Sequence, residues 1–334
     1  MNSNGGSAVT IRPLTAGDLD GCVAIDRKAT GNVRKGFFEK RLNAALQEPK
    51  QFIYVGCEDG SDLAGFALAR VVAGEFGRDE QIVVFDAMGV DPDAQGHGIG
   101  HALIEGIETV MRQKGISDMH SQVPWSNTGL LHFLNSAGFE LAPRVVLERG
   151  TEERIITSYD DEEADDGVDP AEMDFSAPEG DDFTALSHDR VPVRSMRADD
   201  LDAIIRIDTR ETGGDHSEYL AAKMKEALTE SGVRVSVIAE QEGHPAGYIM
   251  ARVDFGEFGR TDAVAVMDTI GVDPGYRHHG VGSALMSQLI ANLATLRVEK
   301  IRTEVDWNGF EIMTYLDRIG FRPAQQVTLK RTIA

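Results

Sequence analysis

The chain has 334 residues, of which 42% are hydrophobic, and it carries a formal net charge of −22 at pH 7. This length predicts about two domains of 100–200 residues each. The acidic balance, without clusters of Lys and Arg, argues against a nucleic-acid partner, because binding phosphates needs such clusters. The two cysteines, Cys22 and Cys57, are too few for a zinc site and are expected in the core, so no metal is predicted.

The chain shows no secretory signal pattern and no apolar run of about 18 residues, so we expect a cytoplasmic protein without a membrane partner. Much of the negative charge lies in residues 151–190, which hold 15 Asp and Glu against two Arg. A segment with so few large apolar residues cannot bury enough surface to offset its ordering entropy. Residues 151–190 are therefore predicted to form a flexible acidic linker.

On either side of this linker the sequence repeats itself at an offset of 182 residues. DAMGVDPDAQGHGIG at 86–100 matches DTIGVDPGYRHHGVG at 268–282. The segment at 11–26 matches that at 193–208 in the same way. We therefore predict two copies of one domain, over 9–150 and 191–334, which could pair with each other within the chain.

In chain order, the first copy shows apolar runs at 51–57, 63–72 and 81–90 that predict strands, followed by a glycine loop and a helix over 101–113. The second copy repeats this order, with an apolar stripe at helical spacing after its loop. Each loop thus joins a strand to the start of a helix. The start of a helix has unpaired N–H groups and the positive end of the helix dipole, so it is a potential anion-binding site.

The loop pattern is neither a P-loop nor a Rossmann fingerprint. It has the form [QR]-x-x-G-x-G, beginning at Gln95 and at Arg277, and each copy ends its last helix with Gly-Phe. On these motifs the chain resembles the GNAT superfamily of acetyl-CoA-dependent N-acetyltransferases. The resemblance implies an α/β fold with a mixed sheet in each tandem domain, and acetyl-CoA lying in the gap between two splayed strands.

The resemblance also implies which residues bind acetyl-CoA. The pantetheine arm would pair with the end of the strand before each loop, and the pyrophosphate would lie on the loop amides. An asparagine before the last helix of the first copy would contribute as well. The residues so assigned are Met88, Gly89, Val90, Gln95, Gly96, His97, Gly98, Ile99, Gly100, Asn127, Ile270, Gly271, Val272, Arg277, His278, His279, Gly280, Val281, Gly282 and Ser283.

Asp86 and Asp268 are the first candidates for proton transfer. Strand alternation places Asp86 on the face of Val84, Met88 and Val90, and burial of a carboxylate raises its pKa toward the range of a base. The alternative is that each pairs with a buried arginine, Arg70 or Arg252, and the two interpretations are about equally supported.

The last helix departs from the family pattern. The family often places a tyrosine four residues before its Gly-Phe, where it protonates the departing thiolate, and this chain has Leu134 and Leu316 there. Tyr315 lies one residue away and is the remaining candidate, unless water serves. Trp125 and Trp307, matched between the copies, are expected in the core.

In the region expected to bind the acceptor, the second copy has His216 and Tyr219 among acidic residues, where the first copy has a basic cluster. An acidic surface suits a cationic amine. We therefore predict an N-acetyltransferase in which a small-molecule or protein amine attacks acetyl-CoA directly in a ternary complex, with the second copy catalytic. The alternative is a non-catalytic protein that binds or senses acyl-CoA with one or both copies degenerate.

Overall fold

The computed structural model describes residues 9–31, 33–47, 49–60, 62–73, 81–152, 191–230, 233–255 and 263–333. Residues 153–190 lie outside this set, so the flexible acidic linker stays a prediction. By their contacts the residues form two compact units. Unit 1 draws on Met1–Val146, Asp254–Val264 and Ala324–Ala334, and unit 2 on Leu147–Val253 and Ala265–Pro323.

The first sequence copy alternates strands and helices in the order expected of an α/β domain, and the predicted strands and helix are confirmed with shifts of no more than two residues at their ends. Its elements are β1 (Thr10–Pro13), η1 (Ala16–Asp18), α1 (Leu19–Thr30), α2 (Lys35–Gln47), β2 (Phe52–Asp59), β3 (Asp62–Ala73), β4 (Gln81–Val90), η2 (Pro92–Ala94), α3 (Ile99–Lys114), β5 (Asp118–Pro124), α4 (Thr128–Ser136), β6 (Glu140–Leu141) and β7 (Arg144–Gly150).

The second copy repeats this order, as the sequence repeat predicts. Its elements are β8 (Val193–Ser195), η5 (Ala198–Asp200), α6 (Leu201–Thr212), α7 (Ser217–Lys225), the π-helical turn η6 (Glu226–Glu230), β9 (Val237–Gln241), β10 (His244–Phe255), β11 (Ala263–Val272), η7 (Pro274–Tyr276), α8 (Val281–Thr295), β12 (Lys300–Asp306), α9 (Phe310–Arg318), β13 (Arg322–Pro323) and β14 (Gln326–Thr332).

Helices cover both faces of the sheet in unit 1. One cluster of buried residues joins the sheet to α3 and includes Leu103, Ile107 and Met111. A second cluster on α1 and α2 includes Ile25 and Phe38. Cys22 and Cys57 are buried and unpaired, which confirms that they belong to the core. Trp125 and Trp307 are more than half exposed, so their assignment to the core was wrong.

Within the described residues, the strands form two seven-stranded sheets, in the orders β1-β2-β3-β4-β5-β14-β6 and β13-β7-β12-β11-β10-β9-β8. The mixed α/β fold class is confirmed, because β4 pairs in parallel with β5 while β2, β3 and β4 pair antiparallel. The β4–β5 register covers Ile82–Val84 with Asp118–His120, whereas β4 continues to Val90. The last part of β4 thus extends past this register, as expected of two splayed strands.

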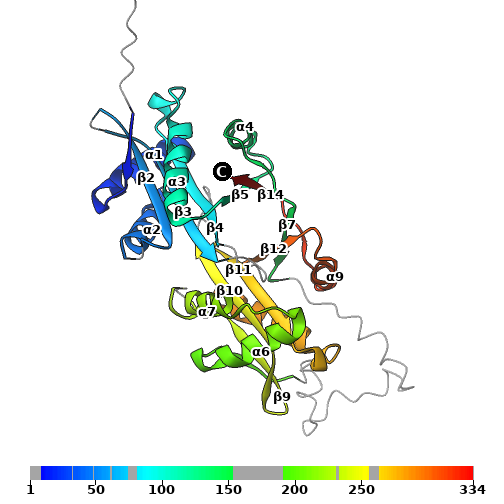
Figure 1. Cartoon of the computed structure of the whole chain (residues 1–334). Coiled ribbons are helices and arrows are strands. Elements are labelled where there is room, and N and C mark those ends of the chain that lie inside the picture. Colours follow the sequence, from blue (N-terminus) through cyan, green and yellow to red (C-terminus); the bar gives the residue numbers. More distant parts are fainter. Residues whose placement is uncertain are drawn as a thin grey trace, which may run out of the picture. The chain divides into compact units, whose positions relative to one another are not determined.

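The two sequence copies exchange their last strands. β14, the end of the second copy, pairs with β5 and β6 of the first, and Figure 1 shows it in red beside β5. β7, its counterpart in the first copy, lies between β12 and β13. As a division of the sequence, 9–150 and 191–334 stay a prediction, but neither sheet is built from one of these segments alone.

Each exchanged strand carries an arginine that lies beside the glycine just after the last helix of the other copy, α4 or α9. Arg331 on β14 pairs with Glu108 of α3 and lies beside Gly138. Arg149 on β7 donates to the Ile319 carbonyl and lies beside Gly320. Both glycines have positive φ, +80° and +92°, the left-handed conformation that favours glycine after a helix.

This exchange predicts the effect of removing β14. A chain ending at Gln325 should lose protection of β5 against amide hydrogen exchange, because β14 pairs with β5 from Asp118 to Pro124. Exchange in β12, whose sheet does not contain β14, should change less. Hydrogen-exchange mass spectrometry of the full and shortened chains measures both strands. Loss of protection in β12 instead of β5 would contradict the exchange.

Candidate functional site

The glycine loops have the same backbone geometry in the two units. Gly98 and Gly280 have φ of +81° and +77°, and helices α3 and α8 begin at the next residue. A Cβ at either glycine would meet no atom within 4 Å, so the loop presents an open face of backbone. The first N–H groups of a helix have no partner in the helix itself, and their positive end attracts anions. Each loop can therefore accept a phosphate group.

The first variable position of the pattern, directly after Gln95 or Arg277, differs between the units. Gly96 has a φ of +82°, and His278 occupies the same position with a φ of +64°. The left-handed conformation costs a residue with a side chain about 1–2 kcal/mol, so unit 2 retains the loop shape in spite of local strain. The histidines at the next position, His97 and His279, contact the carbonyls of Ala94 and Arg277 through Nδ1.

The aspartate of the repeated Gly-Val-Asp-Pro motif has a structural role that sequence analysis did not assign. Asp91 accepts the N–H of Asp93 and pairs with Lys28 at 2.8 Å. Asp273 accepts the N–H of Gly275 and pairs with Arg210 at 2.8 Å. These contacts lower the pKa of both carboxyls and fix the turn that leads each strand into its loop. The repetition of the motif was the signal that could have revealed this role.

The strand ends before the loops are buried against an aromatic side chain. A Cβ at Gly89 would lie 2.6 Å from the Phe66 ring, and a Cβ at Gly271 would lie 2.6 Å from the Tyr248 ring. Both positions therefore require glycine. Met88, Val90, Ile270 and Val272 flank these glycines, and Gln95 donates to the Val90 carbonyl at 3.4 Å.

Strand alternation around Asp86 is interrupted, which corrects the sequence prediction. Ala69 of β3 pairs with Phe85 and Leu68 pairs with Ala87, so Asp86 is the extra residue of a β-bulge. Phe85 packs in the cluster with α3, whereas Ala87 packs in the cluster with α1 and α2. Val84 and Met88 therefore lie on opposite faces, because a bulge shifts the alternation by one residue.

Asp86 forms the ion pair that the sequence analysis weighed against a catalytic role. Its side chain is 0% exposed, both carboxylate oxygens accept from Arg70 Nε at 2.9 Å, and Arg41 lies 3.8 Å away. Asp86 thus lies between one buried and one partly buried cation. These contacts favour the ion-pair interpretation, and a role for Asp86 in proton transfer stays a prediction.

Asp268 in unit 2 also lies between two cations, and a second acid, Glu226, is added there. Arg252 donates to Asp268, and Lys223 Nζ lies 3.2 Å from the Asp268 carboxylate. Glu226 lies within 3.4 Å of both cations, so unit 2 has two acids against two cations where unit 1 has one acid. Its role in proton transfer likewise stays a prediction.

The side chains assigned on the last helices have local partners. Asn127 caps α4 by accepting the N–H of Leu130 at 3.1 Å. The Tyr315 hydroxyl donates to the Gly282 carbonyl at 2.9 Å, which joins α9 to the first turn of α8. Burial raises the pKa of Tyr315, so the hydroxyl stays protonated at neutral pH. It is a proton donor that is already engaged with a carbonyl.

His216 and Tyr219, assigned to the acceptor site, belong to the start of α7. His216 Nδ1 lies 2.6 Å from an Asp208 oxygen, and both side chains are 11% exposed. The buried Tyr219 hydroxyl lies 3.5 Å from the Asp268 carbonyl oxygen on β11. The structure thus places His216 beside α6, and Tyr219 beside β11, the strand that carries Ile270, Gly271 and Val272.

Glu211 is a site residue that sequence analysis listed only as part of an acidic region. Its carboxylate accepts the Val272 N–H at 3.3 Å and pairs with Arg277 at 3.3 Å. Burial raises its pKa, and Arg277 opposes that effect. Its counterpart in the first copy is Ala29.

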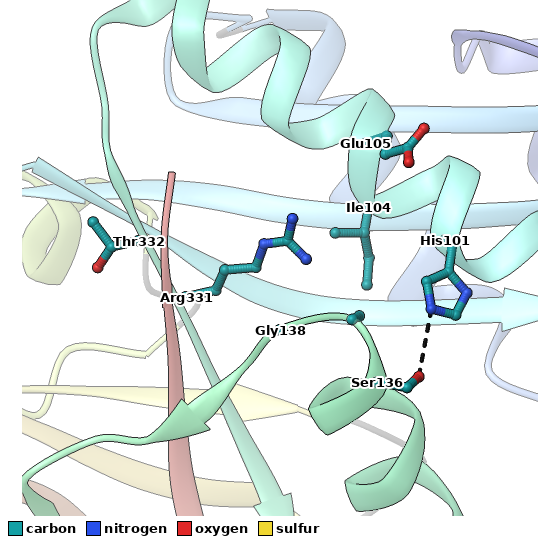
Figure 2. Close-up of a pocket in the computed structure, with 8 residues that line it drawn as sticks. His101, Ile104, Glu105, Ser136, Gly138, Arg331 and Thr332 are labelled. Carbon is teal, nitrogen blue, oxygen red and sulfur yellow. Dashed lines mark hydrogen bonds between the residues drawn. The ribbon is translucent and has the colours of Figure 1, made fainter. Parts of the chain in front are cut away.

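A separate open pocket of about 460 Å³ lies in unit 1 between α3, the end of α4 and β14. Figure 2 shows His101 and Ser136 joined by a hydrogen bond on one side and Arg331 on the other. Its lining includes none of the residues assigned to acetyl-CoA. Among the residues that the structure describes, no group of three or more His, Cys, Asp and Glu is arranged to hold a metal, and no helix is long and apolar enough to cross a membrane.

Comparison with known proteins matches the acetyltransferase (GNAT) family model to residues 23–139 and 201–321, one match in each sequence copy. A mycothiol acetyltransferase of Clavibacter sepedonicus is 27% identical over 139 residues, which are 40% of this chain and 43% of that protein. The chain therefore spans less than half the length of this relative. A [ribosomal protein bS18]-alanine N-acetyltransferase of Escherichia coli K12 is 26% identical over 133 residues, 40% of this chain and 82% of that protein.

Among solved structures, a tandem GNAT protein from the clavulanic acid biosynthesis pathway matches with a TM-score of 0.60 at 16% identity, covering 97% of this chain and 98% of that one. At this identity the likeness establishes the fold alone. It covers nearly the whole chain, which agrees with a tandem arrangement of two such folds.

Proposed function

The chain belongs to the acetyltransferase (GNAT) family, and on that premise we propose that it transfers an acetyl group from acetyl-CoA to an amine in a ternary complex, with chemistry in unit 2. The mycothiol acetyltransferase and the ribosomal-protein alanine N-acetyltransferase are similar to it only at low identity, so the acceptor is argued from the site.

The observation that carries the proposal is the open backbone face at Gly98 and Gly280. In unit 1 the strand that precedes this loop, β4, also continues past its register with β5. The loop amides of 96–100 and 278–282 would hold the pyrophosphate. The amides near Val90 and Val272 would hold the pantetheine arm. Bound in this way, acetyl-CoA supplies an activated thioester, and the chain contributes mainly proximity and orientation.

The two units share the backbone conformation of the glycine loop but differ in the side chains around it. At matched positions unit 1 has Phe66, Ala29 and Arg34, and unit 2 has Tyr248, Glu211 and His216. Groups that can exchange a proton or bind a cation therefore gather in unit 2. This difference supports catalysis in unit 2, with unit 1 binding acetyl-CoA without transferring its acetyl group.

The acceptor follows from the same comparison. Unit 2 has Glu211, Asp215 and Glu218 at the α6–α7 junction, where the first copy has Arg27, Lys28 and Lys35 nearby. An acidic surface attracts a cationic substrate. An aliphatic amine, whether a small polyamine or a peptide amine, is the acceptor class that fits it.

Release of free thiol tests the proposal. The full chain is incubated with acetyl-CoA and a panel of spermidine, n-butylamine, Nα-acetyl-lysine amide and a peptide with N-terminal alanine, and free CoA is measured with a thiol reagent. We expect amine-dependent release and an acetylated product by mass spectrometry. Binding of acetyl-CoA without turnover on any amine would favour the alternative, an acyl-CoA-binding or sensing protein, and absence of binding would overturn both.

Glu211 should oppose acetyl-CoA binding in unit 2, because it already accepts the Val272 N–H and pairs with Arg277. Replacing Glu211 with Ala frees the Val272 N–H for the pantetheine arm. A hydrogen bond of this kind is worth about 0.5–1.5 kcal/mol, so the affinity of unit 2 for acetyl-CoA should rise between about 2- and 10-fold. Calorimetry in a Gly98→Val background reports unit 2 alone. Glu299→Ala removes an exposed charge elsewhere and should have no effect, and a weaker affinity in Glu211→Ala would contradict the prediction.

A further inference from the structure

His216 and Asp208 form a buried pair at the junction of α6 and α7. Asp208 Oδ2 lies 2.6 Å from Nδ1 of His216, and both side chains are 11% exposed. A carboxylate at Nδ1 holds the proton on that nitrogen and leaves Nε2 as the basic atom. This is the arrangement by which a carboxylate orients a histidine for general base catalysis.

A glycine packs against the Nε2 side of the ring. A Cβ at Gly214 would lie 2.9 Å from Nε2, closer than real side chains approach. Gly213, which ends α6 with a φ of +75°, turns the chain so that Gly214 can lie there. The loop thus brings its backbone to the ring without placing a side chain over the basic nitrogen.

The pair is connected to the strand end where the thioester is expected. Tyr248 lies near Asp208, because burial first, and then the Asp208 charge, raise the pKa of this tyrosine. The same ring covers Gly271, next to Val272. One tyrosine therefore lies between the carboxylate that orients His216 and the strand assigned to pantetheine.

The first copy contains an inactive version of the same pair. Asp26, the counterpart of Asp208, binds Arg34, the counterpart of His216, at 2.9 and 2.5 Å, and both side chains are about 5% exposed. Arginine does not release its proton in proteins. Tyr248 is replaced there by Phe66, which cannot contact the carboxylate through a hydroxyl. The carboxylate is kept in both copies, whereas the proton-exchanging ring is found in unit 2.

We propose that His216 is the general base of the acetyl transfer, with Asp208 as its positioning residue, a role that rests on the proposed function. His216 Nε2 takes a proton from the ammonium group of the acceptor and later releases it to solvent. The neutral amine nitrogen then forms a bond to the thioester carbonyl carbon, and the carbon–sulfur bond breaks. The departing thiolate receives the second proton of the amine nitrogen, which gives the amide and free CoA.

Other ionisable groups face the pair and enter its pH dependence. Asp208 and Glu211 lie on α6, Asp215 on the α6–α7 loop, and Tyr248 on β10. Three of these groups are carboxyls, and together they favour a cationic amine beside the ring. A pH profile must therefore be read against variants that change His216 and Asp208 while leaving Glu211 and Asp215 in place.

The decisive variant is His216→Arg, because Arg34 on Asp26 shows that an arginine at this position can pair with the carboxylate in a folded unit. With the amine that the wild type acetylates fastest, we expect kcat/KM to fall at least 100-fold, within the usual contribution of a general base. The dissociation constant of acetyl-CoA should change less than 2-fold. The converse variant, Arg34→His, should leave kcat/KM unchanged.

Asp208→Asn separates positioning from packing. Asparagine keeps the shape of the side chain but not its charge, so we expect a smaller loss of kcat than in His216→Arg. The ascending limb of the pH–rate profile should shift in Asp208→Asn and should be absent in His216→Arg. Activity of His216→Arg above half that of the wild type, or loss of its acetyl-CoA binding, would overturn the proposal. A wild-type chain that does not bind acetyl-CoA would instead overturn the proposed function itself.

Discussion

Replacing Gly280 with Val is expected to abolish acetyl-CoA binding in unit 2, and Gly98→Val should do the same in unit 1. Each glycine has a φ near +80°, a conformation that costs a residue with a side chain about 1–2 kcal/mol and more for a β-branched one. The new side chain would also project over the open backbone face that receives the phosphates. Isothermal calorimetry should show the stoichiometry falling from two sites to one in each single variant.

The two units offer matched controls for the strain itself. Gly60 and Gly243 lie in hairpin turns and have φ of +72° and +78°, and a Cβ at either would meet no atom within 4 Å, as in the loops. Valine there should lower thermal stability by a similar amount while leaving two binding sites. If Gly280→Val kept two sites, the loop of unit 2 would not be the phosphate site.

Removing the carboxylate of Asp86 should destabilise the protein more than any other single truncation discussed above. Its side chain is fully buried between Arg70 and Arg41, and breaking a buried ion pair by deleting one partner costs about 3–5 kcal/mol. Asp268→Ala should cost less, because Glu226 remains beside Lys223 and Arg252. Denaturant unfolding of the two variants measures the difference.

Turnover and rescue distinguish the roles of these aspartates. Asp268→Asn should lower turnover and preserve acetyl-CoA affinity if Asp268 transfers a proton, and unchanged turnover would end that assignment.

For Asp86, the double variant Asp86→Ala with Arg70→Met removes the uncompensated cation and should recover part of the lost stability. A double variant as unstable as the sum of its parts would argue against a paired role.

Several features of the chain could be predicted from local sequence because short-range chemistry dictates them. The glycine loop requires left-handed backbone before a helix, and both loops show it at Gly98 and Gly280. The 182-residue repeat predicted two equal successions of strands and helices, and each element of the first copy has a counterpart in the second. The burial of Cys22 and Cys57 followed from their apolar counterparts.

Other features depend on contacts between residues far apart in the chain. Alternation along β4 could not reveal the bulge at Asp86, because a bulge is defined by pairing with β3. Trp125 and Trp307 lie just past the ends of β5 and β12 and are exposed. The Trp125 N–H donates to the carbonyl of Gln325, 200 residues away at the start of the exchanged segment.

The sequence by itself thus determined the family, the duplication and the two glycine loops, because the motifs that reveal them are runs of consecutive residues. Only the tertiary structure decided how the copies differ chemically. His216 and Asp208 are eight residues apart, and Glu211 and Val272 are 61 apart, yet each pair is in contact. The same carboxylate holds an arginine in one copy and a histidine in the other, and only folding brings those side chains within hydrogen-bonding distance.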